Sequence, residues 1–267
     1  MPVFPTTGCR PTHLSSSAPP PRSFMASSAT PASPDASDDE GGGSSGVTSR
    51  CLVRSVYGVV SQLSEFKKQV IRDLGFGGLL YLPSIFKVNL KFSIWLLSRL
   101  DPTTSEIVLD ENRRILVYEK DVGTVFGIPA GELDVCRADI TSKGVEFLRY
   151  TLGLDRSSAR SFKGLESVLQ DQIDENSSRQ EIDRFKIAFV IYVMVHLLAP
   201  SAKWDHGNID FWGALKNADL IDRFNWCRYV YGHVLEDAQR VRECVSQNLP
   251  VTSISGCHLF LQSSRSL

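Results

Sequence analysis

Apolar residues recur at helical spacing along most of the chain, and the longest such stripe lies between residues 219 and 245. Within it they are separated alternately by four and three positions, as on one face of an α-helix. They are Leu220, Phe224, Cys227, Tyr231, Val234, Ala238, Val241 and Val245. Such a stripe can serve a partner helix, but most helical stability comes from tertiary burial. We therefore expect this helix to pack on its own domain.

The same spacing predicts further helices in both halves of the chain. A short helix begins near Ser64 and ends before Gly75, because glycine commonly follows a last helical turn. A second runs from about Asn89 to Leu100, where Asp101-Pro102 stops it. In the second half, helices are expected over residues 141–152, 157–170, 179–198 and 219–245. These patterns predict a mainly α fold.

The period changes from that of a helix to that of a strand between residues 107 and 117. The alternating apolar residues are Ile107, Leu109, Ile115 and Val117, and the turn formers between them are Asp110, Glu111 and Asn112. This pattern predicts a short β-hairpin. A helical turn is expected to start at Asp121 and to be closed by Ile128-Pro129.

Residues 1–49 differ in composition from the rest of the chain. They are rich in Ser, Pro, Thr, Ala and Gly, and their few large apolar residues cannot offset the entropy of ordering them. We expect a disordered leader, followed by a single helical domain over residues 50–267 that contains the small hairpin. The first 34 residues also lack acids and carry Arg10 and Arg22, as a plastid transit peptide would. The disordered leader is preferred because low-complexity tails are common.

Charge and composition narrow the classes of partner. The 267-residue chain has a formal net charge of -1, which gives no electrostatic footprint for nucleic acid or for an anionic membrane surface. Its longest apolar run, Ile187 to Leu198, is shorter than a membrane span of roughly 18 residues, so we expect a core helix and no membrane partner. The six cysteines include no C-x-x-C pair. We expect reduced thiols, which suit the cytosol or the nucleus.

Two histidines and two aspartates gather around the end of the helix predicted over residues 179–198. They are His196, Asp205, His206 and Asp210. Pro200 separates the histidines, so they do not share a helical face as in a zinc-binding H-E-x-x-H helix, and no complete ligand set is visible. We interpret His196 as a hydrogen-bonded core residue or as a charge at a helix C-terminus, and Asp210 as a helix cap. No metal site is predicted.

Other candidate chemistry is weaker still. Cys257 and His258 are adjacent, but sequence neighbours rarely converge in space, so we interpret Cys257 as a small buried apolar residue. The glycines of GFGGLL (Gly75 to Leu80) resemble a phosphate loop only loosely and are expected to allow a tight turn. The sequence therefore assigns no catalytic, cofactor-binding or metal-ligating residue and predicts that the protein is not an enzyme.

Basic side chains offer a further hypothesis, direct binding of DNA. A phosphate-binding patch would form if the fold brought five of them together. These are Lys67, Lys68, Arg72, Arg113 and Arg114. Adjacent basic residues, such as Lys67-Lys68 and Arg113-Arg114, are too sparse along the chain to form a nucleic-acid-binding stripe or a strong nuclear import signal. An unidentified protein partner is therefore a stronger expectation than nucleic acid.

Seven segments, in this order, resemble those of a known family. They are GFGGLL, WLLSRLDPTT, DVGTVFGIPAG, FVIYVMVHLLAPSAKWD, DFWGAL, FNWCRYV and SGCHLFLQ, which begin at Gly75, Trp95, Asp121, Phe189, Asp210, Phe224 and Ser255. The family is the plant mobile domain family, also labelled aminotransferase-like, and the chain is most similar to its grass subgroup derived from transposable elements. The resemblance covers most of residues 60–262 and implies a helical domain with a small hairpin.

The resemblance also implies a function: a non-enzymatic interaction module of transposable-element origin, with a nuclear role in silencing or genome maintenance. Plastid and cytosol stay open as compartments. No lysine stands in a context for a pyridoxal phosphate Schiff base, so no cofactor is expected despite the aminotransferase-like label. Similar proteins continue where this chain closes with SSRSL, and some then carry a protease for ubiquitin-like modifiers. We therefore expect the region over residues 50–267 to be C-terminally truncated. The alternative function is that of an N-terminal fragment of such a protease, without its catalytic domain.

Overall fold

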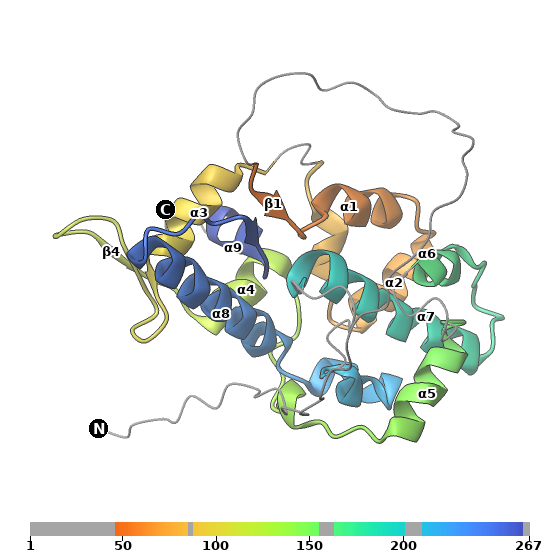
Figure 1. Cartoon of the computed structure of the whole chain (residues 1–267). Coiled ribbons are helices and arrows are strands. Elements are labelled where there is room, and N and C mark those ends of the chain that lie inside the picture. The colour runs from red at the N-terminus through yellow and green to blue at the C-terminus, as the bar shows by residue number, and fades with distance from the viewer. Residues whose placement is uncertain (1–45, 85–87, 155–162, 201–209, 264–267) are drawn as a thin grey trace, which may run out of the picture. The chain divides into compact units, whose positions relative to one another are not determined.

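Most of the helices expected from the apolar spacing are present in the computed structural model, which describes residues 46–84, 88–154, 163–200 and 210–263 (Figure 1). The α-helices are α1 (Val53–Ser61), α2 (Glu65–Asp73), α3 (Leu90–Arg99), α4 (Glu119–Phe126), α5 (Ser142–Thr151), α6 (Lys163–Gln170), α7 (Arg179–Val193), α8 (Trp226–Ser246) and α9 (His258–Ser263). The 3-10 helices are η1 (Gly77–Tyr81), η2 (Val135–Arg137), η5 (Trp212–Leu215) and η6 (Ala218–Arg223), and η3 (Met194–Leu198) is a π-helix. The mainly α class is confirmed.

Short strands accompany the helices. An antiparallel sheet has the order β2 (Leu100–Asp101), β3 (Glu106–Val108), β4 (Arg114–Leu116), so the predicted hairpin is confirmed and gains one strand. The added strand arises where the helix was predicted to stop, because Leu100 leaves α3 with an extended backbone. A second pairing is parallel and joins the start and the end of the domain, β1 (Thr48–Ser49) and β5 (Ser253–Ile254).

The domain begins earlier than predicted. Thr48 and Ser49 belong to the segment expected to be disordered, yet they form β1, so the boundary at residue 50 is wrong by a few residues. Their place is set by pairing with β5, about 200 residues away, which no local pattern announces. The rest of the predicted leader, residues 1–45, lies outside the described residues, as do residues 157–162 of a predicted helix.

α8 packs against α3 and α4 along its buried face (Figure 1). The middle of the predicted stripe is buried as expected, at Cys227, Tyr231, Val234, Ala238 and Val241. Its ends are wrong. The helix begins at Trp226 because the Asn225 side chain caps it by accepting the backbone N–H of Arg228, and the preceding residues form η6 instead. Leu220 and Val245, at the two ends of the stripe, are exposed.

α7 contributes the most deeply buried segment of the described chain. Every residue from 187 to 193 is buried, as predicted for a core helix. α7 begins with a capping box, in which Ser178 accepts the backbone N–H of Glu181 and the Glu181 carboxylate accepts that of Ser178. None of the described helices combines the length and the apolar character needed to cross a membrane.

Two glycine-containing segments of the sequence meet backbone to backbone. The N–H of Gly78 in GFGGLL donates to the carbonyl oxygen of Gly127 in DVGTVFG at 3.2 Å. A methyl group at Gly78 would come 2.5 Å from the Cα of Gly127, and one at Gly127 would come 2.7 Å from the Cα of Gly78. Gly127 also has a φ of 55°, which favours glycine, and it ends α4. We call this contact the glycine joint (Gly78 and Gly127).

α4 itself starts two residues before its predicted start at Asp121. The Asp121 carboxylate accepts the backbone N–H of Tyr118 at 2.7 Å, so it lies in the first turn rather than ahead of it. The predicted tight turn at the first glycine of GFGGLL is confirmed, since Gly75 has a φ of 82° after α2.

Candidate functional site

His258 is the centre of a buried hydrogen-bond cluster. The residue is 1% exposed, its Nε2 lies 2.6 Å from Ser49 Oγ, and its Nδ1 lies 2.8 Å from Ser93 Oγ. Gln262 extends the cluster by donating to Ser93 Oγ at 2.5 Å. Burial lowers the pKa of His258 to about 4, so the ring is neutral near pH 7 and donates from one nitrogen while it accepts at the other. We call these four residues the His258 cluster (Ser49, Ser93, His258, Gln262).

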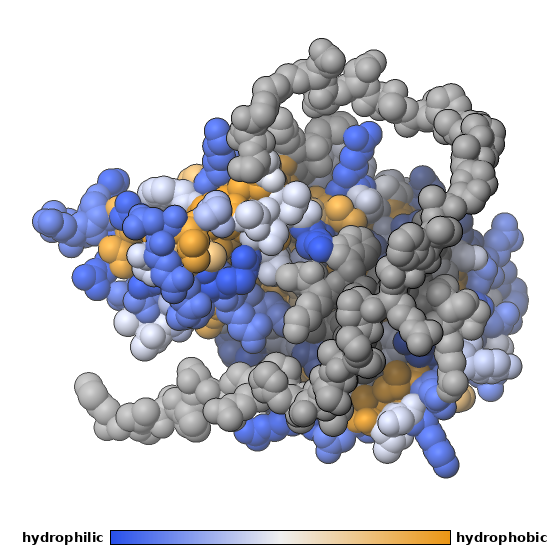
Figure 2. Space-filling model, viewed as in Figure 1, coloured by the Kyte–Doolittle hydropathy of each residue, from blue (hydrophilic) through white to orange (hydrophobic). Residues whose placement is uncertain are grey.

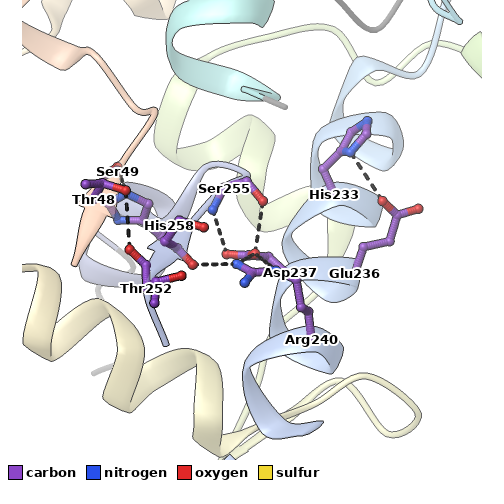
Figure 3. A network of polar contacts seen from close by, with 10 residues as sticks. Thr48, Ser49, His233, Glu236, Asp237, Arg240, Thr252, Ser255 and His258 are labelled. Atoms are coloured by element: carbon purple, nitrogen blue, oxygen red, sulfur yellow. Dashed lines mark hydrogen bonds and ion pairs between the residues drawn. The ribbon is translucent and has the colours of Figure 1, made fainter. Parts of the chain in front are cut away.

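The His258 cluster has one catalytic feature and lacks others. A serine hydroxyl 2.6 Å from a histidine nitrogen has the spacing of a nucleophile and its base. On its other side, however, His258 meets the Ser93 hydroxyl rather than a carboxylate, and a pKa of about 4 makes the ring a weak base. What the cluster does is join three elements, since Ser49 comes from β1, Ser93 from α3 and His258 from α9. Figure 3 shows Ser49 beside His258.

Cys257 does not pair with its sequence neighbour, because both ring nitrogens of His258 contact serine hydroxyls. It is fully buried, which confirms its interpretation as a small apolar core residue. Burial raises the pKa of the Cys257 thiol well above its ordinary value, and the Cys51 thiol acts in the same direction.

A second buried network holds β5 on α8 (Figure 3). The Asp237 carboxylate is 2% exposed and accepts hydrogen bonds from the backbone N–H and the hydroxyl of Ser255, at 3.1 and 3.0 Å. Arg240 pairs with it at 2.5 Å and also donates to the carbonyl oxygen of Ser253 at 2.8 Å. Burial raises the pKa of Asp237, although its hydrogen bonds and the arginine act in the opposite direction.

Asp237→Asn is expected to lower the free energy of unfolding by about 1 to 2 kcal/mol, because a buried carboxylate with several donors becomes an amide that no longer matches all of them. A chemical denaturation curve at pH 7 measures the effect. Glu236→Gln is the matched control on the same helix. Its side chain is 63% exposed and pairs only with His233 in the described contacts, so a change within about 0.5 kcal/mol is expected. Equal effects of the two variants would contradict this prediction.

His196 lies on η3 and packs against Tyr192. Their ring centroids are 4.3 Å apart, and the His196 Nδ1 lies 2.9 Å from the carbonyl oxygen of Tyr192. The Tyr192 hydroxyl donates in turn to Glu166 Oε1 at 3.3 Å. Burial lowers the pKa of His196. The hydrogen bond to the Tyr192 carbonyl and the charge of Glu166 act in the opposite direction and raise it. The hydrogen bond predicted for His196 is therefore present, but the residue is only partly buried rather than part of the core.

The structure describes only one of the other three members of the predicted histidine–aspartate group. Asp205 and His206 lie outside the described residues. Asp210 is not a helix cap, because η5 begins two residues later without a side-chain cap, and its carboxylate instead accepts the Tyr229 hydroxyl at 2.8 Å. Across residues 46–84, 88–154, 163–200 and 210–263, no three His, Cys, Asp or Glu side chains are grouped as a metal site requires.

The five basic residues considered for DNA binding are not brought together. Three lie on α2 and two on the hairpin of β3 and β4, at opposite sides of the domain in Figure 1. Lys67 is buried and donates to the carbonyl oxygen of Leu169 at 2.8 Å. The others pair with acids: Lys68 and Arg72 with Glu65, Arg113 with Asp110 and Arg114 with Glu106. The patch on which that hypothesis depended is therefore not formed.

The exposed side of α3 presents aromatic rings with cations beside them. Phe92 and Trp95 are 38% and 40% exposed, and their rings stack with centroids 5.9 Å apart and an interplanar angle of 13°. The Arg99 guanidinium lies over the Trp95 ring, 5.6 Å from its centroid. Lys91 is exposed one turn before Trp95, and no acidic residue occurs in α3. We call these residues the α3 face (Lys91, Phe92, Trp95, Arg99); Figure 2 shows apolar side chains at the surface among charged ones in this region.

Sequence reasoning placed this helix correctly but missed its exposed face. The apolar residues of α3 are spread around the helix rather than gathered on one side. The polar Ser93 is fully buried, whereas Phe92 and Trp95 are exposed. A hydrophobic pattern points the other way, because it places serine outside and aromatic rings inside. The only sequence signal for this face is the composition of the α3 segment, in which aromatic and basic residues occur and acidic residues do not.

A family model described as "Domain of unknown function (DUF8566)" matches residues 49–262. The chain belongs to this family. No curated protein and no solved structure matched the chain. The DUF8566 match runs from Ser49 to Gln262, and both of these residues belong to the His258 cluster. The cluster therefore ties the first part of the DUF8566 region to its last.

Proposed function

We propose that this member of the DUF8566 family is a non-enzymatic interaction module that binds a protein partner through the α3 face. The observation that carries the proposal is the Trp95 ring, held half-exposed between Phe92 and Arg99. Tryptophan, tyrosine and arginine dominate the binding energy of protein interfaces. A ring that is already fixed loses little conformational freedom when a partner binds.

The arrangement of the rings favours a protein over nucleic acid. Phe92 precedes Trp95 by three positions on the helix and Arg99 follows it by four, so they contact the indole from opposite directions along α3. Nucleic-acid bases bind aromatic side chains by stacking on their faces. Because Phe92 and Arg99 already contact the Trp95 ring, less of the ring is open to stacking by a base, which favours the apolar side chains of a protein.

Charge specifies the partner further. Lys91 and Arg99 flank the aromatic pair, and α3 contains no carboxylate to neutralise them. The complementary surface is a segment that carries both carboxylates and apolar side chains. Such charges affect the rate of association and the choice of partner more than the affinity.

The non-enzymatic part of the proposal has its own support. Three described groups with the chemistry of a nucleophile or a base, Ser49, His196 and His258, make internal hydrogen bonds. The resemblance to the plant mobile domain family supports the finer part, a nuclear module of transposable-element origin that acts in silencing or genome maintenance.

The double variant Phe92→Ala/Trp95→Ala tests the proposal. In proximity labelling with the full chain, we expect it to lose at least one partner that the wild type enriches. Because the two rings are only 38% and 40% exposed, a melting curve of the purified variant checks that it still folds. The matched control is Phe147→Ala/Tyr150→Ala, which removes two aromatic side chains that are 66% and 84% exposed on α5. The control should keep the partner.

Two outcomes would contradict the proposal. In one, the α3 variant enriches the same proteins as the wild type. In the other, the interaction survives removal of the rings but is abolished by added nucleic acid or by salt alone, which would point to phosphate contacts. Binding of the purified partner to both variants, measured at two salt concentrations, separates these outcomes from a loss of folding.

A further inference from the structure

α5 carries two of the most exposed aromatic side chains of the described residues. Phe147 is 66% exposed and Tyr150 is 84% exposed, and they lie three positions apart on one face of the helix. The opposite face holds α5 on the domain through the buried Leu148 and, directly after the helix, Leu152. α5 lies at the edge of the domain in Figure 1. Adjacent exposed rings of this kind mark a contact site.

A cation completes the outer face of α5. Lys143 is exposed and precedes Phe147 by four positions and Tyr150 by seven. We call these residues the α5 face (Lys143, Phe147, Tyr150). A lysine ammonium group is attracted to the face of an aromatic ring. Within one helix, however, Lys143 and Tyr150 are two turns apart, about 10 Å along the axis, so a contact between them needs a second helix.

We propose that the α5 face is a self-association site, at which two copies of the protein meet with their α5 helices antiparallel. A two-fold axis midway between Lys143 and Tyr150 places each lysine opposite the tyrosine of the other copy. The same contact then forms twice, as in every two-fold interface. The two Phe147 rings come together beside the axis, where aromatic pairs stabilise each other. A parallel arrangement would instead place lysine beside lysine.

The α5 face fits a second copy because it is complementary to itself. Its cation and its most exposed ring lie at opposite ends, so a half turn brings each group to one that attracts it. The α3 face differs in this respect, because the Arg99 guanidinium already lies over the Trp95 ring of the same copy. The two faces lie on different helices, so self-association through α5 does not need the α3 face.

The small size of the α5 face makes this association weak. Two aromatic side chains with these exposures bury roughly 300 Å² per copy. A standard stable interface buries about 800 Å² per partner. The protein should therefore be monomeric in dilute solution and form dimers at high local concentration.

Sedimentation equilibrium of the full chain, from low micromolar to several hundred micromolar, tests the proposal. The average mass should rise with concentration from the monomer value of 29.6 kDa toward twice that value. Phe147→Ala/Tyr150→Ala should weaken the association by at least about tenfold, because buried aromatic anchors dominate interface energies. Phe92→Ala/Trp95→Ala, on the α3 face, is the matched control and should leave it unchanged. Circular dichroism checks that each variant keeps its helices.

A double-mutant cycle tests the antiparallel arrangement. Lys143→Gln and Tyr150→Leu each remove one half of the proposed contact, whereas Lys143→Arg keeps the cation and should keep the association. Because the two residues are too far apart to touch within one copy, their fold losses multiply unless they meet across the interface. We expect the double variant to lose clearly less than the product of the two single losses.

Four results would overturn the proposal. The average mass stays at the monomer value over the whole concentration range. Association persists in Phe147→Ala/Tyr150→Ala, or is lost in Phe92→Ala/Trp95→Ala, so that the self-contact lies elsewhere. The losses of Lys143→Gln and Tyr150→Leu multiply. Lastly, a monomeric protein whose α5 variant loses a different protein in proximity labelling would assign the α5 face to that partner instead.

Discussion

Gly78→Ala is expected to lower the free energy of unfolding by about 4 kcal/mol, a loss large enough to leave much of a marginally stable domain unfolded. The added methyl group would come 2.5 Å from the Cα of Gly127, and what it meets there is backbone rather than a flexible side chain. The two segments would have to separate, which would stretch the hydrogen bond from Gly78 N–H to the Gly127 carbonyl. Denaturant unfolding followed by circular dichroism measures the loss.

Gly232→Ala is the matched control for the glycine joint. Gly232 lies within α8, and a methyl group there would meet nothing within 4 Å. Alanine in a helix interior is favoured over glycine by roughly 0.5–1 kcal/mol, so this variant should be more stable than the wild type. Opposite signs for the same chemical change would show that the contact, and not the loss of glycine flexibility, determines the effect. Equal and small effects would mean that the joint is not as close as described.

Acid is expected to destabilise the domain between about pH 6.5 and pH 4, chiefly through His258. The pKa of this histidine falls from an ordinary value of 6.5 to about 4 because it is buried. The unfolded chain therefore binds a proton in this range that the folded protein does not, and the equilibrium shifts toward unfolding as the pH falls. The stability due to neutral His258 is fully present above pH 6.5, and about 3 kcal/mol of it is lost by pH 4.

Two other buried groups affect the same pH range. Burial also lowers the pKa of His196, so its protonation adds to the acid-induced loss. The pKa of Asp237 is raised by burial, which has the opposite sign, because the folded protein then binds the proton more readily. The comparison of wild type with His258→Gln isolates the contribution of His258, since both proteins keep the other two groups.

In His258→Gln the amide can still donate to one serine and accept from the other, but it does not titrate. We expect the free energy of unfolding of this variant to depend less on pH than that of the wild type, with the difference confined to pH 4–6.5. Urea unfolding at several pH values measures it. The same pH dependence in both proteins would show that His258 is not the buried group described here.

Local signals explain which parts of the fold the sequence predicts well. α2 begins and ends where Ser64 and Gly75 indicate, because a capping hydroxyl and a glycine with positive φ act over three or four residues. The start of α8 was misplaced because the apolar spacing continues through η6, while the cap at Asn225 depends on a single side chain. β1 was missed because its partner β5 lies at the other end of the domain.

The functional groups were harder to predict than the helices, for a related reason. Ser49 and His258 are separated by 209 positions and Ser93 and His258 by 165, so no motif could join them. Gly78 stood out in the sequence only as one of the turn-forming glycines of GFGGLL, and Gly127 did not stand out at all, although the two form a contact between two segments. The exposure of Trp95 follows from which side of α3 faces α8, and that is a property of packing rather than of spacing.

We infer that the glycine joint and the His258 cluster help to build one domain that folds as a unit and presents the α3 face on a rigid helix. Thermal unfolding of the full chain, followed both by far-ultraviolet circular dichroism and by tryptophan fluorescence, tests it most directly, because Trp226 is fully buried in the core. We expect a single cooperative transition with the same midpoint for both signals. Separate midpoints, or a gradual loss of helix without a transition, would contradict it.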